Sequence, residues 1–150
     1  MKKMIKICDG DIFETDCDII VCPVNCIGTM GKGLAKEFAR RFPEYSRRYS
    51  RACIDGMIRP GTPVLHLFAG VYDKDIISFP TKDHWKNPSK LEYIENGLKS
   101  IVRNIENMPH SIAFPALGCG CGELLWKDVL PLMKNYLGPL KITYEIYEPK

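Results

Sequence analysis

No run of apolar residues in this chain approaches the ~20 residues that are needed to cross a bilayer. The basic N-terminus is not followed by the apolar core or the small-residue cleavage site of a signal peptide. Internal repeats, low-complexity tracts and linker-like stretches are also missing. We therefore expect one domain over residues 1–150, in a monomeric, cytoplasmic protein without a membrane partner.

The ligand spacing of a metal site is missing as well. There is no C-x-x-C pair, and none of the three histidines stands at ligand spacing from a cysteine. The seven cysteines are odd in number and several lie in apolar segments, which favours reduced thiols over a disulfide framework. Cys119 and Cys121 are conceivable metal ligands, but we interpret them as small side chains of a crowded loop. We expect no metal and no cofactor.

The sequence contains no P-loop of the form G-x-x-x-x-G-K-[ST], which argues against a P-loop NTPase. It does contain two other glycine-rich loops, at residues 28–33 and 118–122. Each follows a segment typical of a strand and precedes a helical pattern. Glycine lets backbone N–H groups approach a ligand, and a helix N-terminus adds positive partial charge. Two such loops facing one another predict a cradle for a diphosphate. The alternative is that the glycines serve only tight turns.

The apolar segments predict strands interleaved with helices. We expect strands at residues 4–8, 18–24, 63–68, 75–79, 111–114 and 140–147, and helices from about 31 to 42, 43 to 53, 91 to 105 and 126 to 137. Ser89-Lys90-Leu91-Glu92 has the form of a capping box. This order predicts a three-layer α/β/α sandwich around a mixed, largely parallel sheet, with the closing strands as candidates for the antiparallel direction. Ligands of such sheets bind beyond the carboxyl ends of the strands, where both glycine loops lie.

Four motifs stand in a fixed order along the chain. They are Gly10-Asp11-Ile12, Val24-Asn25, Met30-Gly31-Lys32-Gly33 and Pro115-Ala116-Leu117-Gly118-Cys119-Gly120. Together they resemble the motifs of a macrodomain, the ADP-ribose-binding fold, and the resemblance covers essentially the whole chain. Two further stretches, residues 79–85 and 89–94, are similar to the DarG branch of that family, antitoxins that remove ADP-ribose from thymidine in DNA.

The resemblance implies a role for each matching residue. Asp11 accepts a hydrogen bond from the adenine amino group, and Asn25 helps to place the hydroxyls of the distal ribose. The two glycine loops hold the diphosphate from opposite sides. The implied ADP-ribose-binding set is Asp11, Ile12, Asn25, Gly31, Lys32, Gly33, Leu117, Gly118, Cys119, Gly120, Cys121 and Gly122. Residue by residue, a turn or cap role for Asp11 and a strand-end turn role for Asn25 stay open.

Lys82 is the residue that the resemblance identifies as catalytic. Cleavage at the anomeric carbon builds oxocarbenium character and releases a group with extra electron density. An ammonium can stabilise that charge, whereas a neutral amine can attack the anomeric carbon or relay a proton. The alternative is a surface lysine that contacts phosphate. His84 and Trp85 are candidates for contacts to the modified base, although Trp85 could equally cover an edge of the core.

Two positions depart from the patterns of the relatives. Gly122 stands where the terminal ADP-ribose protein glycohydrolase of humans carries a catalytic acid, and Cys22 stands where DarG-type sequences usually have asparagine. We expect an ADP-ribosyl glycohydrolase that acts on ADP-ribosylated DNA, with a DNA ADP-ribosyltransferase toxin as a possible partner. The alternatives are a non-catalytic ADP-ribose-binding module, which the Cys22 departure motivates, an ADP-ribose 1″-phosphate phosphatase, and a generic nucleotide-binding domain.

Overall fold

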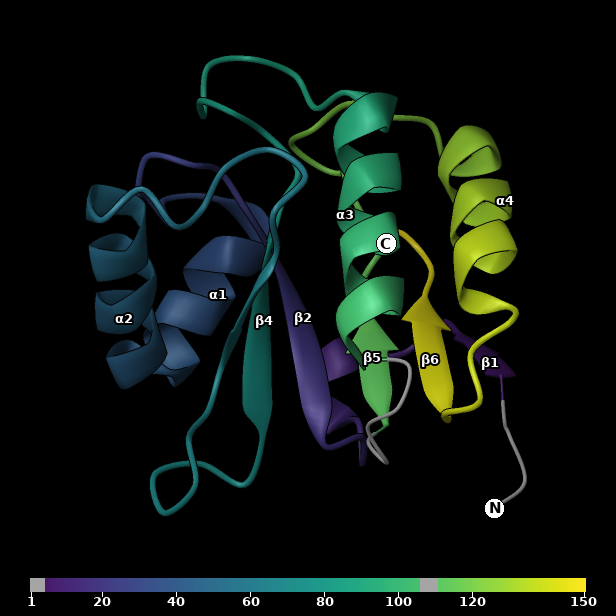
Figure 1. The fold of residues 1–150 in the computed structure, drawn as a ribbon, viewed down its shortest axis with the longest axis horizontal. Coiled ribbons are helices and arrows are strands. Elements are labelled where there is room, and N and C mark those ends of the chain that lie inside the picture. The colour runs from purple at the N-terminus through teal and green to yellow at the C-terminus, as the bar shows by residue number, and fades with distance from the viewer. Residues whose placement is uncertain (1–4, 106–110) are drawn as a thin grey trace.

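Six strands form one sheet in the order β1-β6-β5-β2-β4-β3 (Figure 1) in the computed structural model, which describes residues 5–105 and 111–150. Their bounds are β1 Ile5–Cys8, β2 Ile19–Val24, β3 Val64–His66, β4 Asp75–Pro80, β5 Ile112–Phe114 and β6 Tyr144–Tyr147. Neighbouring strands pair in parallel except β3 and β4, which pair antiparallel. The mixed, largely parallel sheet is therefore confirmed. The antiparallel direction expected of closing strands is wrong for β6, which runs parallel to both of its neighbours.

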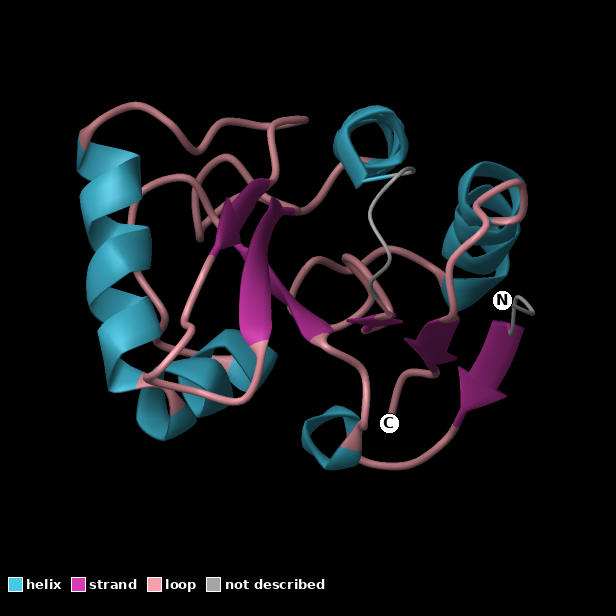
Figure 2. Ribbon diagram, turned by 60° about the horizontal axis from the view of Figure 1, so that its bottom comes forward, coloured by secondary structure: helices cyan, strands magenta, loops and turns pink. Residues whose placement is uncertain are grey.

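Four α-helices and one short 3-10 helix complete the described chain. They are η1 Ile12–Glu14, α1 Gly33–Arg41, α2 Pro43–Ile54, α3 Leu91–Ile105 and α4 Trp126–Leu137. Figure 2 shows α3 and α4 above the sheet and α1 and η1 below it, with α2 at the side of the molecule. This is the three-layer arrangement that the alternation of strands and helices predicts. No helix among the described residues is both long and apolar enough to span a membrane.

The sheet is apolar on both faces, which explains the unbroken apolar run of β2. Ile19 and Val21 point into a cluster with α3 and α4, whereas Ile20 and Cys22 point into a second cluster with α1 and α2. All four side chains are at most 1% exposed. A strand that buries both faces leaves only its ends available for a ligand, so function is confined to the loops.

The capping box expected at Ser89 does not form, because the Ser89 hydroxyl is buried and has no hydrogen-bond partner within the described residues. The first turn of α3 is instead closed by the backbone bond from Tyr93 N–H to the carbonyl oxygen of Lys90, at 2.9 Å. The Ser89 N–H donates to the carbonyl oxygen of Gly122 at 3.0 Å. Ser89 therefore ties the start of α3 to the second glycine loop.

Candidate functional site

A cavity of about 1360 Å³ opens at the carboxyl ends of β2, β4, β5 and β6. The end of each strand contributes to its wall, through Val24, Thr81, Pro115 and Tyr147. Both glycine loops, η1, the first and last turns of α1 and residues 81–82 and 85–87 also contribute. The position matches the expectation for ligands of parallel sheets.

The first glycine loop ends at an uncapped helix. Lys32 is the N-cap residue of α1 and makes no side-chain capping hydrogen bond, so α1 begins at Gly33 rather than near Gly31. The first-turn N–H groups of a helix have no partner within the helix. Because Gly31, Lys32 and Gly33 all line the cavity, this positive end of α1 faces the space where an anion would sit.

The second glycine loop is closed on itself and leaves no room for side chains at two positions. The Leu124 N–H donates to the carbonyl oxygen of Gly118 at 2.8 Å. Gly118 has φ 75°, a conformation that favours glycine. A β-carbon at Gly122 would overlap both the Ser89 hydroxyl and the Gly118 carbonyl. An acid at position 122 would therefore require the loop to change shape, which gives a structural reason for the departure at Gly122.

The two glycine loops meet across the cavity. A β-carbon on Gly33 would lie 3.4 Å from the Cys121 sulfur. Cys119, Gly120 and Cys121 line the cavity together with the first loop. The opposed backbone segments that the sequence predicted are thus brought to one place.

Lys82 lies half-buried in the cavity wall, on a turn that is fixed to β2. The Thr81 N–H donates to the carbonyl oxygen of Val24 at 2.9 Å. Cys26 donates twice, from its N–H to the Asp83 carbonyl oxygen at 3.1 Å and from its thiol to the Lys82 carbonyl oxygen at 3.4 Å. Burial raises the pKa of Cys26 to about 12, so the thiol keeps its proton and remains a donor. Lys82 Nζ makes one long contact with the described part of the chain, to the Trp85 carbonyl oxygen at 3.4 Å.

Asn25 lines the cavity, but the structure uses its side chain to shape the first loop. Its Oδ1 accepts from the Ile27 and Gly28 N–H groups at 3.1 and 3.2 Å, and from the Tyr49 hydroxyl at 2.7 Å. Its Nδ2 donates to the Thr29 hydroxyl at 2.7 Å. The strand-end turn role is therefore present, and contact with a ribose stays a prediction.

Asp11 combines two roles that the sequence left open. It is the N-cap of η1, where its Oδ1 accepts from the Phe13 N–H at 2.9 Å, and it lines the cavity beside Ile12. The hydrogen bond uses one carboxylate oxygen. The second oxygen carries the lone pairs that a ligand amino group would need.

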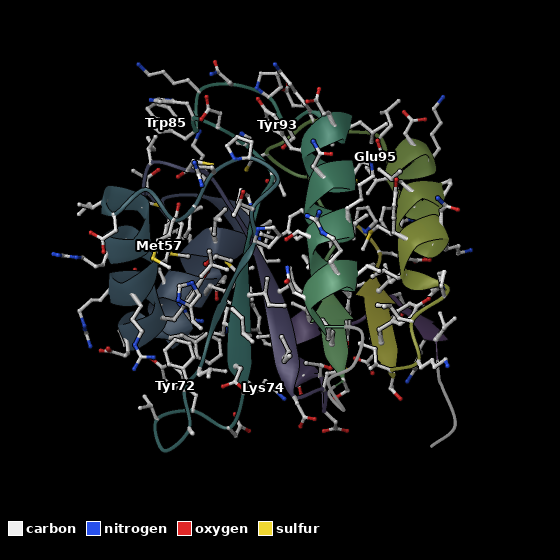
Figure 3. All side chains as sticks on the ribbon, in the orientation of Figure 1. Met57, Tyr72, Lys74, Trp85, Tyr93 and Glu95 are labelled. Atoms are coloured by element: carbon white, nitrogen blue, oxygen red, sulfur yellow. The ribbon has the colours of Figure 1, made fainter. Side chains whose placement is uncertain are left out.

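Three singled-out residues lie outside the cavity lining formed by the described chain. Leu117 is fully buried in the cluster with α3 and α4. His84 accepts from the Lys86 N–H at 3.1 Å and so organises its own loop. Cys22 is fully buried on the α2 side of the sheet, where burial raises the pKa of its thiol. Trp85, by contrast, lines the cavity and is 49% exposed on the loop after β4 (Figure 3).

Several cavity or supporting residues carry no motif that points to the site, and the capping motif at Ser89 pointed only to a helix start. Arg41, Phe13 and Glu37 line the cavity, and Cys26, Tyr49 and Ser89 support its walls. In the sequence Arg41 is one of five arginines between residues 40 and 51, a group typical of a solvated helix face. Among the described residues, no group of three or more His, Cys, Asp or Glu side chains is placed to hold a metal ion.

Comparison with known proteins gives consistent matches. The Macro domain family model matches residues 21–133. The curated DNA ADP-ribosyl glycohydrolase of Mycobacterium tuberculosis is 44% identical over 129 residues, which cover 84% of this chain and 36% of that protein. The protein of the same name from Thermus aquaticus is 37% identical over 155 residues, which cover 97% and 41%. The chain thus spans well under half the length of these relatives.

Solved structures agree with the sequence matches. The macrodomain of Mycobacterium tuberculosis DarG superposes with a TM-score of 0.92 at 39% identity and covers 99% of both chains. Thermosipho africanus DarTG in complex with ADP-ribose gives a TM-score of 0.91 at 37% identity, over 97% of this chain and 42% of that one. Because the family model spans most of the sequence and these relatives share its fold at well over 30% identity, the chain belongs to the Macro domain family and is similar to the macrodomains of DarG.

Proposed function

We propose that this macrodomain is an ADP-ribosyl glycohydrolase that releases ADP-ribose from a nucleobase in DNA, with thymidine as the expected base. The observation that carries the proposal is that Lys82 and both glycine loops line one cavity. The relatives named DNA ADP-ribosyl glycohydrolase support the reaction class. The Thermosipho africanus relative is named as a fusion of a DNA ADP-ribosyl transferase with such a glycohydrolase, which supports a toxin of that kind as partner.

The loops bind the part of the substrate that does not react. Backbone N–H groups at the start of α1 and in residues 118–122 hold the diphosphate, since both line the cavity from opposite sides. The distal ribose then extends toward the turn after β4, where Lys82 is fixed by its backbone bonds to β2 and Cys26. Positioning of this kind lowers the activation free energy of glycosidic cleavage, because the entropy of bringing the amine to the anomeric carbon is already lost when the substrate binds.

Lys82 acts on the bond between the anomeric carbon and the base nitrogen. When that bond breaks, its electron pair leaves with the base, and the Lys82 ammonium stabilises the resulting charge or donates its proton. Water then adds to the anomeric carbon, so that free ADP-ribose and the unmodified base are formed. A neutral amine would instead attack the anomeric carbon as the base leaves with the electron pair of the broken bond, and it would form an N-glycosyl adduct; opening of the ribose ring would convert this adduct into a Schiff base, which borohydride would reduce and trap.

The direct test compares wild-type protein with Lys82→Ala on ADP-ribosylated DNA oligonucleotides and, in parallel, on ADP-ribosylated proteins. We expect the wild type to release label from DNA and the variant to lose at least about 100-fold of that rate, a typical general-acid contribution. Affinity for free ADP-ribose, measured by calorimetry, should stay within about threefold, because the loops carry the binding energy. Lys86→Ala is the matched control, since Lys86 lines the same cavity but is exposed and lies over the Trp85 ring.

Three outcomes would overturn the proposal. One is unchanged turnover by Lys82→Ala, and another is release from protein but not from DNA. The third is release of inorganic phosphate from ADP-ribose 1″-phosphate without glycohydrolysis. The cysteine at position 22 gives no support to a binding module without activity. Its side chain lies in the core and is not part of the cavity lining, so the exchange of asparagine for cysteine removes no polar group from that lining.

A further inference from the structure

The end of the cavity formed by η1 and the last turn of α1 holds a stacked pair of side chains. The Arg41 guanidinium carbon lies 4.3 Å from the centroid of the Phe13 ring, over its face. The Phe13 ring also packs against Phe38 and Phe42, with centroids 4.9 and 6.3 Å away. Phe38 is fully buried, so the Phe13 ring is anchored to the core. The guanidinium therefore rests on a fixed aromatic surface at the cavity wall.

Glu37 supports the same arrangement. Its carboxylate lies 3.5 Å from Arg41 Nε, and both residues line the cavity. Gly33, Glu37 and Arg41 are spaced by four residues and so share one face of α1. From Gly33 to Arg41 the helix rises about 12 Å, so its two ends contribute to separate parts of the same cavity wall. A ligand whose diphosphate lies at the start of α1 would therefore place another of its groups near Arg41.

Arg40 shows what the cavity position adds. Arg40 pairs with the same Glu37 at 2.8 Å, closer than Arg41 does, but its side chain is 65% exposed and lies outside the cavity lining of the described chain. The ion pair between Arg41 and Glu37 is longer, at 3.5 Å, and the Arg41 guanidinium lies over the Phe13 ring. Exposed ion pairs of this kind contribute little to stability. The placement of Arg41 is thus better explained by what it presents to the cavity than by its salt bridge.

We propose that the Arg41 guanidinium, held over the Phe13 ring, is the platform on which the adenine base of ADP-ribose stacks, and that it determines the preference for a ligand carrying a base. The proposal rests on the proposed function, because it assumes that ADP-ribose occupies this cavity. A guanidinium is planar and weakly hydrated, so it stacks on an aromatic ring on one side and on a base on the other. A lysine ammonium carries the same charge but is not planar, so it cannot stack on a base in this way.

The test measures the affinity of wild type, Arg41→Ala, Arg41→Lys and Arg40→Ala by calorimetry. Two probes are used: ADP-ribose, and an analogue in which a hydrogen atom replaces the adenine. We expect Arg41→Ala to weaken ADP-ribose binding about tenfold, in keeping with the stacking contribution of one base, and to change binding of the baseless analogue less than twofold. Arg41→Lys should behave like Arg41→Ala, and Arg40→Ala like wild type. Thermal unfolding of each variant verifies that it is folded.

Each contrary result has a separate meaning. Equal weakening of both probes, or wild-type affinity in Arg41→Lys, would show that Arg41 acts through charge alone and would overturn the stacking role. Wild-type affinity in Arg41→Ala would remove Arg41 from the site altogether. If the wild-type protein itself failed to bind ADP-ribose, the proposed function would fail, which is distinguishable because no variant is needed to see it.

Discussion

Three polar side chains form a hydrogen-bonded chain inside the cluster between the sheet and α2. The Tyr45 hydroxyl lies 2.6 Å from the Ser78 hydroxyl, which lies 3.0 Å from His66 Nε2. Burial, with a smaller effect from the nearby Arg48 charge, lowers the pKa of His66 to about 4. His66 is therefore neutral near pH 7, and its ring accepts from or donates to a serine rather than pairing with an acid.

This buried histidine predicts a pH dependence of stability. In the unfolded chain histidine has a pKa of about 6.5, so as the pH falls the unfolded state takes up the proton first. The contribution of the neutral His66 to the free energy of unfolding is therefore complete above pH 6.5. It is lost as the pH falls from 6.5 toward 4, by an amount on the order of 3 kcal/mol. Urea unfolding at several pH values between 7.5 and 4 measures it. His66→Gln is the control, and the contribution is refuted if wild type and variant lose the same free energy between pH 6.5 and 5.

Helix α4 begins without a capping side chain. Its N-cap residue, Leu125, has the extended conformation that a cap requires (φ −89°, ψ 133°), but a leucine has no oxygen to accept from the first-turn N–H groups. The side chain is 55% exposed, so little packing holds it in place. The start of α4, next to the second glycine loop, is therefore less stable than a capped helix start would be.

Leu125→Asp should stabilise the protein. A carboxylate at this position can accept from the Lys127 N–H, since the Asp128 N–H already donates to the Leu125 carbonyl oxygen at 3.0 Å, and it interacts favourably with the positive end of the helix. We expect the free energy of unfolding to exceed that of Leu125→Ala by about 1 kcal/mol, because both variants remove the exposed leucine but only one adds a cap. Urea denaturation of the two variants measures the difference. Equal midpoints would mean that the introduced carboxylate forms no capping hydrogen bond at the start of α4.

Elements with strong local signals were predictable from sequence, and those decided by packing were not. The periodic apolar residues gave α3 its observed bounds, and Pro43 marked the start of α2. The last strand was expected from Leu140 but begins at Tyr144, because Leu140 and Ile142 are buried in the core without joining the sheet. Alternating apolar residues do not distinguish a strand from a loop that covers the core.

At the scale of the whole molecule, the ordered motifs predicted both glycine loops, the Lys82 turn and their common edge of the sheet. The hydrogen bonds that hold the walls of the cavity in place could not be predicted from the sequence, because they join residues that are far apart along the chain. Cys26 donates to the Lys82 carbonyl oxygen across 56 positions, and Tyr49 donates to Asn25 across 24. Neither contact leaves a periodicity or a motif. The capping motif at Ser89 gave a wrong prediction for the same reason, since its side chain is buried against Gly118 and Gly122 of the second glycine loop.

The central claim is that one cavity holds a diphosphate between two backbone loops and presents the attached sugar to a lysine. A crystal structure of the protein with ADP-ribose tests it most directly. The account predicts the diphosphate between the start of α1 and residues 118–122, with the anomeric carbon of the distal ribose facing the Lys82 ammonium. ADP-ribose bound outside this cavity, or bound within it with that carbon turned away from Lys82, would contradict the account.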